Sequence, residues 1–337
     1  MDMMERIYER AAACPQRVAF PEATEEKILL AAKECVEKRL IVPVLVGDPA
    51  AVRAAAAQYS VDLTGMELFD STDEAAVEEL VVAYHQMNDM LSEKTLKRRA
   101  QRDCMYTALY LLALGKVDAM FSGLVHTTGD VIAAGSLIIG LKDGVVTPSS
   151  IGIFKIPGYE GSEGDLLAFG DSAVCVNPEP EELASVAVSA CETVQSLLGW
   201  EPRCAFLSYS TDGSAESSLV DKVREALKIA QEKRPDLKID GEFQLDAAIN
   251  PKVAAKKVGR ASEVAGKANI IIWPDINVGN IGVKLVQNFA GTDAYGPLLQ
   301  GFKKVVCDCS RSAPVSELVG NIAMAAVRAQ SEGTTNS

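Results

Sequence analysis

Short apolar runs rich in β-branched residues alternate with longer amphipathic stretches along this chain, and this alternation restricts its fold more than any other feature. Runs of the first kind are typical of strands. Stretches with apolar residues three and four positions apart are typical of helices. An alternating order of strands and helices favours a largely parallel sheet covered by helices on both faces. The sequence therefore predicts an α/β fold, with binding loops at the carboxyl ends of the strands.

The pattern predicts strands over residues 17–22, 41–48, 117–123, 203–210, 237–244, 269–275 and 303–309. It predicts helices over residues 25–39, 49–59, 180–198, 214–233 and 315–330. With 337 residues, the chain is long enough for two medium-sized domains. The tail over 331–337 is expected to be disordered.

Composition excludes some partners. The net charge of −13 argues against nucleic acid, and a charged amino-terminal stretch argues against a signal peptide or a spanning helix, so we expect no membrane partner. The eight cysteines are scattered without a CxxC pair, which predicts reduced thiols and a cytoplasmic protein.

Four polar stretches follow expected strands and lead into a helix or turn. They are "SGLVHTTGD" (122–130), "SYSTDGSAE" (208–216), "PDINVGNIGVK" (274–284) and "CDCSRSAPVSE" (307–317). The amino end of a helix offers unpaired N–H groups to an anion such as phosphate. None is a Walker loop or a GxGxxG sequence, and each taken alone fits an ordinary βα turn equally well.

Taken together, these stretches carry a family resemblance. With "DGEFQLDAA" (240–248) and "YGPLLQG" (295–301), they stand in the order and spacing found in phosphate acetyltransferases. Over essentially its whole length the chain resembles the phosphate acetyl/butyryltransferase family (phosphotransacetylase), and the ethanolamine-utilisation type most of all.

The resemblance implies a two-domain fold like that of isocitrate and isopropylmalate dehydrogenases, with a cleft between the domains. The first domain would be discontinuous, 1–145 plus 302–330, and the second would be 146–301. The resemblance also implies a homodimer. The implied reaction is the reversible transfer of a short acyl group, most of all acetyl, between coenzyme A and inorganic phosphate. Coenzyme A would be a substrate, with no bound cofactor, no metal and no covalent intermediate.

Three residues would carry the chemistry that the resemblance implies. Arg311 would hold the phosphoryl group through a bidentate contact, and Ser310 would donate its hydroxyl to the reacting oxygen. Glu317 stands where the family usually has an aspartate as general base, so the arm is one methylene longer. The other interpretation of Glu317 is a first-turn carboxylate that complements the helix dipole.

A larger set would bind the substrates. It comprises Thr127, Thr128, Ser208, Ser210, Thr211, Ser214, Asp275, Gly279, Asn280, Gly296, Pro297 and Gln300. Each of them also fits a capping or turn role.

The sequence departs from the family where the family has basic residues. Ala133 stands at one arginine position, and the stretch 84–95 around Gln86 has no arginine. Lys94, Lys97, Arg98 and Arg99 follow shortly and could replace the lost contacts.

The signature stretch around Ser310 and Arg311, residues 307–312, also differs from the family. Ser312 stands where the family has a glycine, and Cys307 and Cys309 stand where it has an asparagine and a leucine. The two cysteines fit a buried strand end better than a metal site or a reactive pair.

Two other hypotheses about the function remain open beside the acyltransferase. One is a divergent paralogue with another acyl group or carrier, and the other is a non-catalytic ligand-binding subunit. A decarboxylating dehydrogenase of the same fold group is disfavoured, because the metal-binding aspartate cluster is missing.

Overall fold

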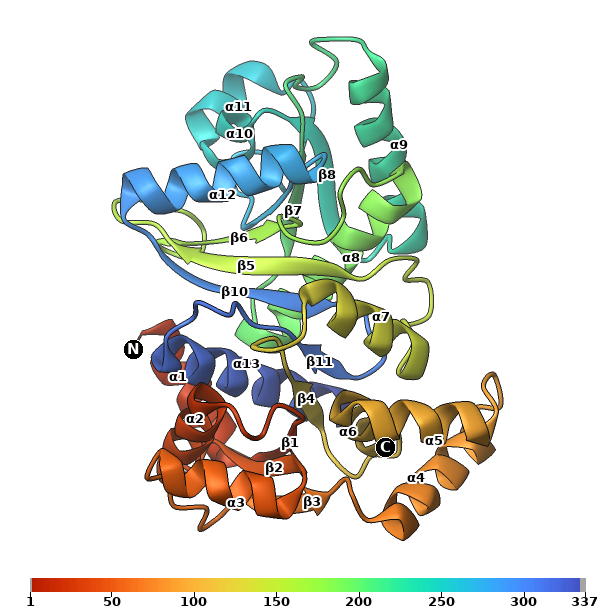
Figure 1. Cartoon of the computed structure of the whole chain (residues 1–337). Coiled ribbons are helices and arrows are strands. Elements are labelled where there is room, and N and C mark those ends of the chain that lie inside the picture. Colours follow the sequence, from red (N-terminus) through yellow and green to blue (C-terminus); the bar gives the residue numbers. More distant parts are fainter. Residues whose placement is uncertain (1, 334–337) are drawn as a thin grey trace. The chain divides into compact units, whose positions relative to one another are not determined.

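The computed structural model describes residues 2–333, with side chains through residue 331. It divides into two compact units, Met1–Gly140 with Phe302–Ser337, and Leu141–Gly301. Figure 1 shows each unit as a sheet with helices packed on it. The sequence-based boundaries lie at 145 and 301, and the compact units divide at 140 and 301.

Unit 1 is built on five parallel strands in the order β11-β4-β1-β2-β3. The strands are β1 (Gln16–Phe20), β2 (Ile41–Gly47), β3 (Glu67–Asp70), β4 (Ala119–Phe121) and β11 (Val305–Cys307). The helices are α1 (Met3–Ala13), α2 (Glu26–Glu37), α3 (Pro49–Gln58), α4 (Glu74–Met87), α5 (Glu93–Arg102), α6 (Cys104–Ala113), α7 (Thr128–Ile138) and α13 (Val315–Gly333).

The core of unit 1 joins the two ends of the chain. Strand β1 lies between β2 and β4, and Val18 is paired with both Pro43 and Ala119. Helix α13 packs against α1 and α2. Leu318 and Ile322 of this helix are fully buried, so the carboxyl-terminal helix is part of the amino-terminal core.

Unit 2 has a six-stranded mixed sheet in the order β10-β5-β6-β9-β7-β8. Strand β5 is antiparallel to both neighbours, and the other neighbouring pairs are parallel. The strands are β5 (Ser149–Lys155), β6 (Leu166–Gly170), β7 (Arg203–Leu207), β8 (Lys238–Phe243), β9 (Ile270–Ile272) and β10 (Asp293–Gln300). The helices are α8 (Pro180–Leu198), α9 (Ser218–Lys233), α10 (Leu245–Ile249), α11 (Pro251–Lys257) and α12 (Ile276–Ala290).

The predicted α/β class with largely parallel sheets is confirmed. Every predicted strand and helix has a counterpart, and these differ mainly at their ends, whereas strands β3, β5, β6 and β10 were not predicted. Helix α9 begins at Ser218 rather than 214, because the Ser217 hydroxyl accepts a hydrogen bond from the Val220 N–H and caps the helix. Of the predicted disordered tail, 331–333 continue α13, and 334–337 lie outside the described residues. No described helix is long and apolar enough to cross a bilayer.

The stretch 274–284 leads from β9 into a helix, as expected, and most of it lies inside helix α12. Asp275 caps this helix by accepting hydrogen bonds from the N–H groups of Asn277 and Val278 at 2.9 and 3.1 Å. Glycines inside a helix usually argue against it. Here Gly279 and Gly282 lie on the indole of Trp273, where an added Cβ would be too close to the ring.

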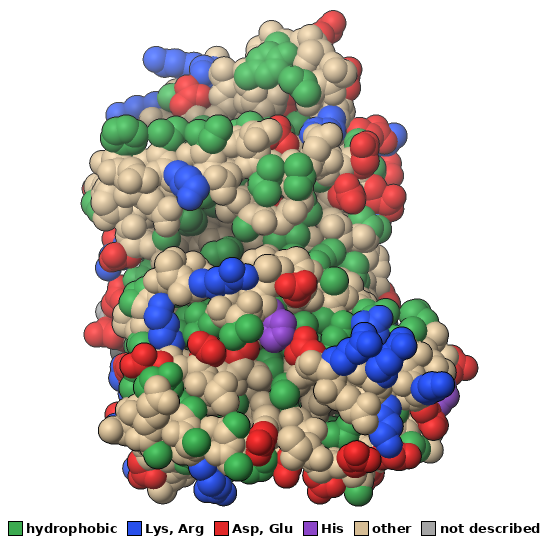
Figure 2. Space-filling view, viewed as in Figure 1, with side chains coloured by type: hydrophobic (Ala, Val, Ile, Leu, Met, Phe, Trp, Pro, Cys, Tyr) green, Lys and Arg blue, Asp and Glu red, His purple; other side chains and the backbone are tan. Residues whose placement is uncertain are grey.

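Helix α12 carries an exposed apolar face, which Figure 2 shows as a row of hydrophobic side chains over this helix. The residues are Val278, Ile281, Leu285 and Phe289, which are 43, 58, 50 and 85 % exposed. Their spacing of three and four positions puts them on one side of the helix.

Candidate active site at the carboxyl ends of the strands

In unit 1 the polar residues gather where three neighbouring strands end. Strands β1, β4 and β11 are adjacent and parallel, so their carboxyl ends meet at one edge of the sheet. Glu22 follows β1, the loop 122–127 follows β4, and the turn 308–313 follows β11. Two of these segments contain residues predicted from sequence, and the third, with Glu22, does not.

Glu22 is the centre of this edge. The residue is 4 % exposed, and its carboxylate accepts a hydrogen bond from the Ser122 hydroxyl at 2.9 Å. It also accepts from four successive backbone N–H groups, those of Gly123, Leu124, Val125 and His126, at 2.8 to 3.1 Å. These bonds outweigh the cost of burial and lower the pKa of Glu22, so a charged carboxylate holds the loop after β4.

His126 links Glu22 to helix α6. Its Nδ1 is 2.8 Å from the Glu22 carboxylate, and its Nε2 is 3.1 Å from Asp103, the N-cap of α6. Burial lowers the pKa of His126, but the hydrogen bond to Glu22 and the charge of Asp103 outweigh it, and the net shift is upward. The imidazole therefore bridges two carboxylates and favours its protonated form.

The loop after β4 and the turn after β11 touch directly. Gly123 has a φ of +120°, and an added Cβ there would collide with Asp308 and the Cys309 backbone. Only glycine permits this approach. The Thr128 hydroxyl donates to the Asp308 carboxylate at 2.5 Å, and Asp308 is 9 % exposed. Thr128 thus ties the first turn of α7 to the signature turn.

Thr127 has a capping role. Its hydroxyl donates to Asp130 at 2.6 Å and also accepts from the Asp130 N–H at 3.2 Å, and the Thr127 N–H donates to the same carboxylate at 3.0 Å. This is a capping box that fixes the start of α7.

Hydrogen bonds to backbone carbonyl groups stabilise the Ser310–Arg311 turn. The Ala313 N–H donates to the Ser310 carbonyl at 3.0 Å, and Lys27 of α2 donates to the carbonyls of Arg311 and Ala313 at 3.1 and 2.8 Å. The Ser310 and Ser312 hydroxyls are 2.9 Å apart. Lys27 therefore orders the turn and leaves the Arg311 side chain exposed.

Arg311 has no hydrogen-bond or ion-pair partner for its guanidinium among residues 2–331. Its positive charge nevertheless affects the pKa of two nearby carboxyl groups. It lowers the pKa of Asp130, after the larger effect of Thr127, and it opposes the rise that burial gives the pKa of Asp308. An exposed guanidinium on a rigid turn is suited to a phosphate oxygen pair.

Glu317 lies in the first turn of α13, five residues after Ser312 in sequence, and is half-buried. Burial raises its pKa, and the charge of Lys27 opposes that rise without cancelling it. A carboxyl group with a raised pKa is closer to the range in which it can exchange a proton near neutral pH.

The two signature cysteines are buried thiols. Strand β11 ends at Cys307, so Cys309 belongs to the turn and not to the strand as predicted. Burial raises the pKa of Cys309, which keeps the thiol protonated. Within residues 2–333 no cluster of three or more His, Cys, Asp or Glu side chains could hold a metal ion.

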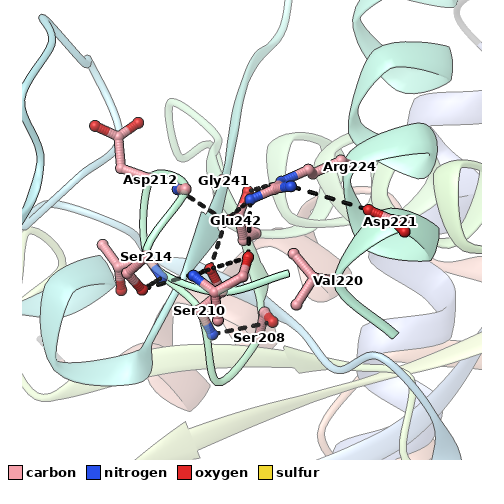
Figure 3. A network of polar contacts seen from close by, with 12 residues as sticks. Ser208, Ser210, Asp212, Ser214, Val220, Asp221, Arg224, Gly241 and Glu242 are labelled. Carbon is pink, nitrogen blue, oxygen red and sulfur yellow. Dashed lines mark hydrogen bonds and ion pairs between the residues drawn. The ribbon is translucent and has the colours of Figure 1, made fainter. Parts of the chain in front are cut away.

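In unit 2 the predicted serines lie around a partly buried ion pair between Arg224 and Glu242, shown in Figure 3. Glu242 accepts from the Ser210 hydroxyl at 2.8 Å, and from Arg224 at 3.0 and 3.1 Å. Burial opposes ionisation, but Arg224, Ser210 and the Gly213 N–H lower the pKa of Glu242 to about 2. The loop after β7 is therefore anchored to the end of β8.

The other hydroxyls of this loop also bond within unit 2. The Ser214 hydroxyl accepts from the Thr211 N–H at 2.9 Å, and the Ser208 hydroxyl accepts from the Ser210 N–H at 3.2 Å. The Thr211 hydroxyl accepts from the Gln244 N–H at 2.9 Å. Ser210 and Thr211 are buried, so their hydroxyls shape the loop.

The remaining predicted residues of unit 2 lie in three different places. Ser208 and Asp275 line an apolar cavity of about 370 Å³ beside Trp273. Asn280, Gly296 and Pro297 line a second cavity of about 150 Å³, between α12 and the β5–β10 pair. Gln300 lies in neither.

Gln300 is inside the core of unit 2. It is 1 % exposed, its side-chain oxygen accepts from the Thr193 hydroxyl at 3.0 Å, and its amide donates to the Ser149 hydroxyl at 2.9 Å. These contacts join β10 to β5 and α8. Gly279 likewise packs on Trp273, as described above.

The structure thus places Thr127, Thr128, Ser310, Arg311 and Glu317 in unit 1, where Thr128 contacts Asp308 and Lys27 holds the Ser310–Arg311 turn. The sequence-based prediction missed the residues that hold them in place, Glu22, Lys27, Asp103, His126 and Asp308. One signal was available, since Glu22 is the last residue of the predicted strand 17–22, at the end where binding loops were expected.

Comparison with known proteins accounts for this arrangement. The Phosphate acetyl/butaryl transferase family model matches residues 2–326. A Phosphate acetyltransferase of Clostridium acetobutylicum is 40% identical over 333 residues, which cover 98% of this chain and 99% of that protein. A Phosphate acetyltransferase of Treponema pallidum is 38% identical over 335 residues, covering 97% and 99%.

Solved structures with a similar fold include a member of the same family. The EutD phosphotransacetylase from Staphylococcus aureus superposes with a TM-score of 0.87 at 33% identity, covering 98% of both chains. A 4-hydroxythreonine-4-phosphate dehydrogenase from Klebsiella pneumoniae gives a TM-score of 0.54 at 11% identity, covering 94% of this chain and 100% of the other, and shares the fold alone. With a family match over nearly its whole length and relatives of this identity, the chain belongs to the phosphate acetyl/butaryl transferase family.

Proposed function

We propose that this protein is a phosphate acetyltransferase, which transfers an acetyl group reversibly between coenzyme A and inorganic phosphate. Relatives that cover 98% of the chain at 40% and 34% identity carry the name Phosphate acetyltransferase. The names of these relatives favour acetyl as the acyl group.

The observation that carries the proposal is the exposed Arg311 on a turn fixed by Lys27. An arginine that forms no ion pair with the described side chains, next to an exposed serine hydroxyl, is suited to bind a phosphate group. The same turn leads into the amino end of α13, whose dipole also favours an anion.

In the proposed reaction, the thiol of coenzyme A attacks the carbonyl carbon of acetyl phosphate. Glu317 takes the thiol proton, the new C–S bond forms, and the C–O bond to the phosphate breaks. Arg311 holds the departing phosphate, and Ser310 donates a hydrogen bond to the oxygen that gains charge. The raised pKa of Glu317 supports its role as a base that works near neutral pH.

We propose two roles for the residues of unit 2 that were predicted to bind substrate. Ser208, Asp275, Asn280, Gly296 and Pro297 line cavities, so we assign them to substrate binding. Internal hydrogen bonds or close packing support a shaping role for the others, which are Ser210, Thr211, Ser214, Gly279 and Gln300. In unit 1, Thr127 and Thr128 would position α7 for the anion.

We also propose a homodimer that works in the cytoplasm. The exposed apolar face of α12 supports the dimer, since Ile281 and Phe289 are 58 and 85 % exposed and contact with a second copy would remove them from water. The eight cysteines form no disulfide, which suits a reducing compartment.

Loss of thioester absorbance from acetyl-CoA on addition of phosphate tests the function. We expect phosphate-dependent loss of the thioester, with one acetyl phosphate formed for each coenzyme A released. A folded protein that binds coenzyme A without this turnover would instead be a ligand-binding subunit. Turnover of a longer acyl-CoA but not acetyl-CoA would identify the divergent paralogue.

A further inference from the structure

Helix α5 carries a dense positive charge in a chain whose net charge is −13. Five of its ten residues are Lys or Arg, namely Lys94, Lys97, Arg98, Arg99 and Arg102. Lys94, Arg98 and Arg102 are four positions apart, so they share one side of the helix, and all three are exposed. Figure 2 shows Lys and Arg side chains gathered over α5.

The two other basic side chains of α5 have partners within unit 1. Lys97 forms an ion pair with Glu78, and Arg99 donates to the Tyr106 hydroxyl at 2.8 Å. Among residues 2–331, no carboxylate pairs with the side chains of Lys94, Arg98 or Arg102. Like charges four positions apart repel each other and destabilise a helix, so this face is better satisfied with an anion bound.

The basic face lies beside the candidate site. Arg102 ends α5, and the next residue, Asp103, lies 3.1 Å from His126 Nε2. His126 leads into Thr128, whose hydroxyl bonds to Asp308, two residues before Ser310. Two side-chain contacts therefore join the end of α5 to the Ser310–Arg311 turn, and all of these residues belong to unit 1.

We propose that the Lys94–Arg98–Arg102 face binds the phosphate groups at the nucleotide end of the acyl carrier. This inference rests on the proposed acyl transfer and makes coenzyme A, a carrier with a diphosphate and a 3′-phosphate, the preferred substrate. Three side chains over two turns span roughly 12 Å, enough to meet more than one phosphate group. Arginine suits this role because its guanidinium bonds two phosphate oxygens at once.

The test compares carriers that have and lack the phosphates. An Arg98→Glu/Arg102→Glu variant is assayed with acetyl phosphate and coenzyme A, 3′-dephospho-coenzyme A or pantetheine. The matched control is Arg53→Glu/Lys252→Glu, which changes the net charge equally at exposed positions of α3 and α11. We expect the first variant to raise the KM for coenzyme A roughly tenfold or more, dephospho-coenzyme A less, and pantetheine within about twofold.

Three results would overturn the inference. The first is a coenzyme A KM equal to that of the control variant. The second is an equal loss with coenzyme A and pantetheine, which indicates damage to the shared site. The third is a raised KM for inorganic phosphate alone, which indicates a phosphate site and not a carrier site.

Inactivity of the wild-type protein with every carrier would count against the proposed function instead. Titration of the wild type and both variants with coenzyme A and pantetheine then tests the α5 face by binding alone. Equal affinity of wild type and Arg98→Glu/Arg102→Glu for coenzyme A would overturn the inference in that case too.

Discussion

The Glu22 carboxylate lies 2.8 Å from Nδ1 of His126, and the same carboxylate accepts the His126 backbone N–H at 3.0 Å. One buried side chain thus fixes both the ring and the backbone of the residue that precedes Thr127. The start of α7 and its contact with Asp308 depend on this pair.

Glu22→Gln should destabilise unit 1. An amide keeps the shape, but its NH₂ group would face N–H donors that now bond to a carboxylate oxygen, and a buried donor left unpaired costs about 1–3 kcal/mol. We expect a loss of about 3 kcal/mol in the free energy of unfolding, measured by urea denaturation. Glu26→Gln, at an exposed position of α2, is the control, and an equal effect of the two changes would contradict the account.

The same pair predicts a pH dependence of stability. The folded pKa of His126 lies above its ordinary value of 6.5, so its contribution is complete below pH 6.5 and is lost as pH rises through the folded pKa. The folded pKa of Glu22 lies below its ordinary value of 4.5, so its contribution is complete above pH 4.5 and is lost as pH falls through the folded pKa.

The stability difference between wild type and His126→Gln should therefore be largest between about pH 4.5 and 6.5 and should shrink above that window. Unfolding curves over a pH series give this difference directly. A difference that is constant with pH would mean that His126 is not charged in the folded protein.

Arg311→Ala should remove acyl transfer and leave the fold intact, because an exposed arginine without an ion pair contributes little to stability. We expect a fall in kcat/KM of about a hundredfold or more, corresponding to about 3 kcal/mol. Arg311→Lys should recover only part of it, since lysine cannot bond two oxygens in a fork. Full activity in Arg311→Ala, with Arg53→Ala as the matched control, would refute the role of Arg311.

Glu242→Gln should destabilise unit 2, because Arg224 and Ser210 would lose a charged acceptor. Hydrogen bonds to charged groups are worth about 1.5–3 kcal/mol, and partial exposure of Arg224 places the expected loss at about 2 kcal/mol. Thermal unfolding compared with Glu232→Gln, at an exposed position of α9, measures it. Because the pKa of Glu242 is lowered to about 2, the wild-type advantage should persist at pH 5.

Local patterns predicted the strands and helices whose own residues carry the signal. The strand, turn and helix around Ser310 are one example, since β11, the turn and α13 follow in the predicted order. Strands β5 and β6 were missed, although they pair with each other and β5 also pairs with β10. Their short apolar runs do not alternate, and Gln300 of β10 meets Ser149 of β5 across 151 positions, so no local pattern marks the pairing.

The residues of the candidate site also include some that the sequence predicted and some that it did not. Ser310, Arg311 and Glu317 followed from a resemblance carried by contiguous residues. The supporting contacts join residues far apart, 104 positions from Glu22 to His126 and 284 from Lys27 to Arg311. Such contacts depend on the order of strands in the sheet, which a single sequence does not specify. The glycines of α12 are required for a related reason, because Trp273 and the Asp171 backbone leave no room for a Cβ only once the helix is packed.

Acylation of coenzyme A by acetyl, propionyl and butyryl phosphate is the measurement that tests the central claim most directly. It should be run side by side on the wild type and the Arg311→Ala variant. We expect rapid formation of the thioester from acetyl phosphate, slower reaction with the longer acyl groups, and loss of all three reactions in the variant. A folded wild-type protein that forms no thioester from any of them would contradict it.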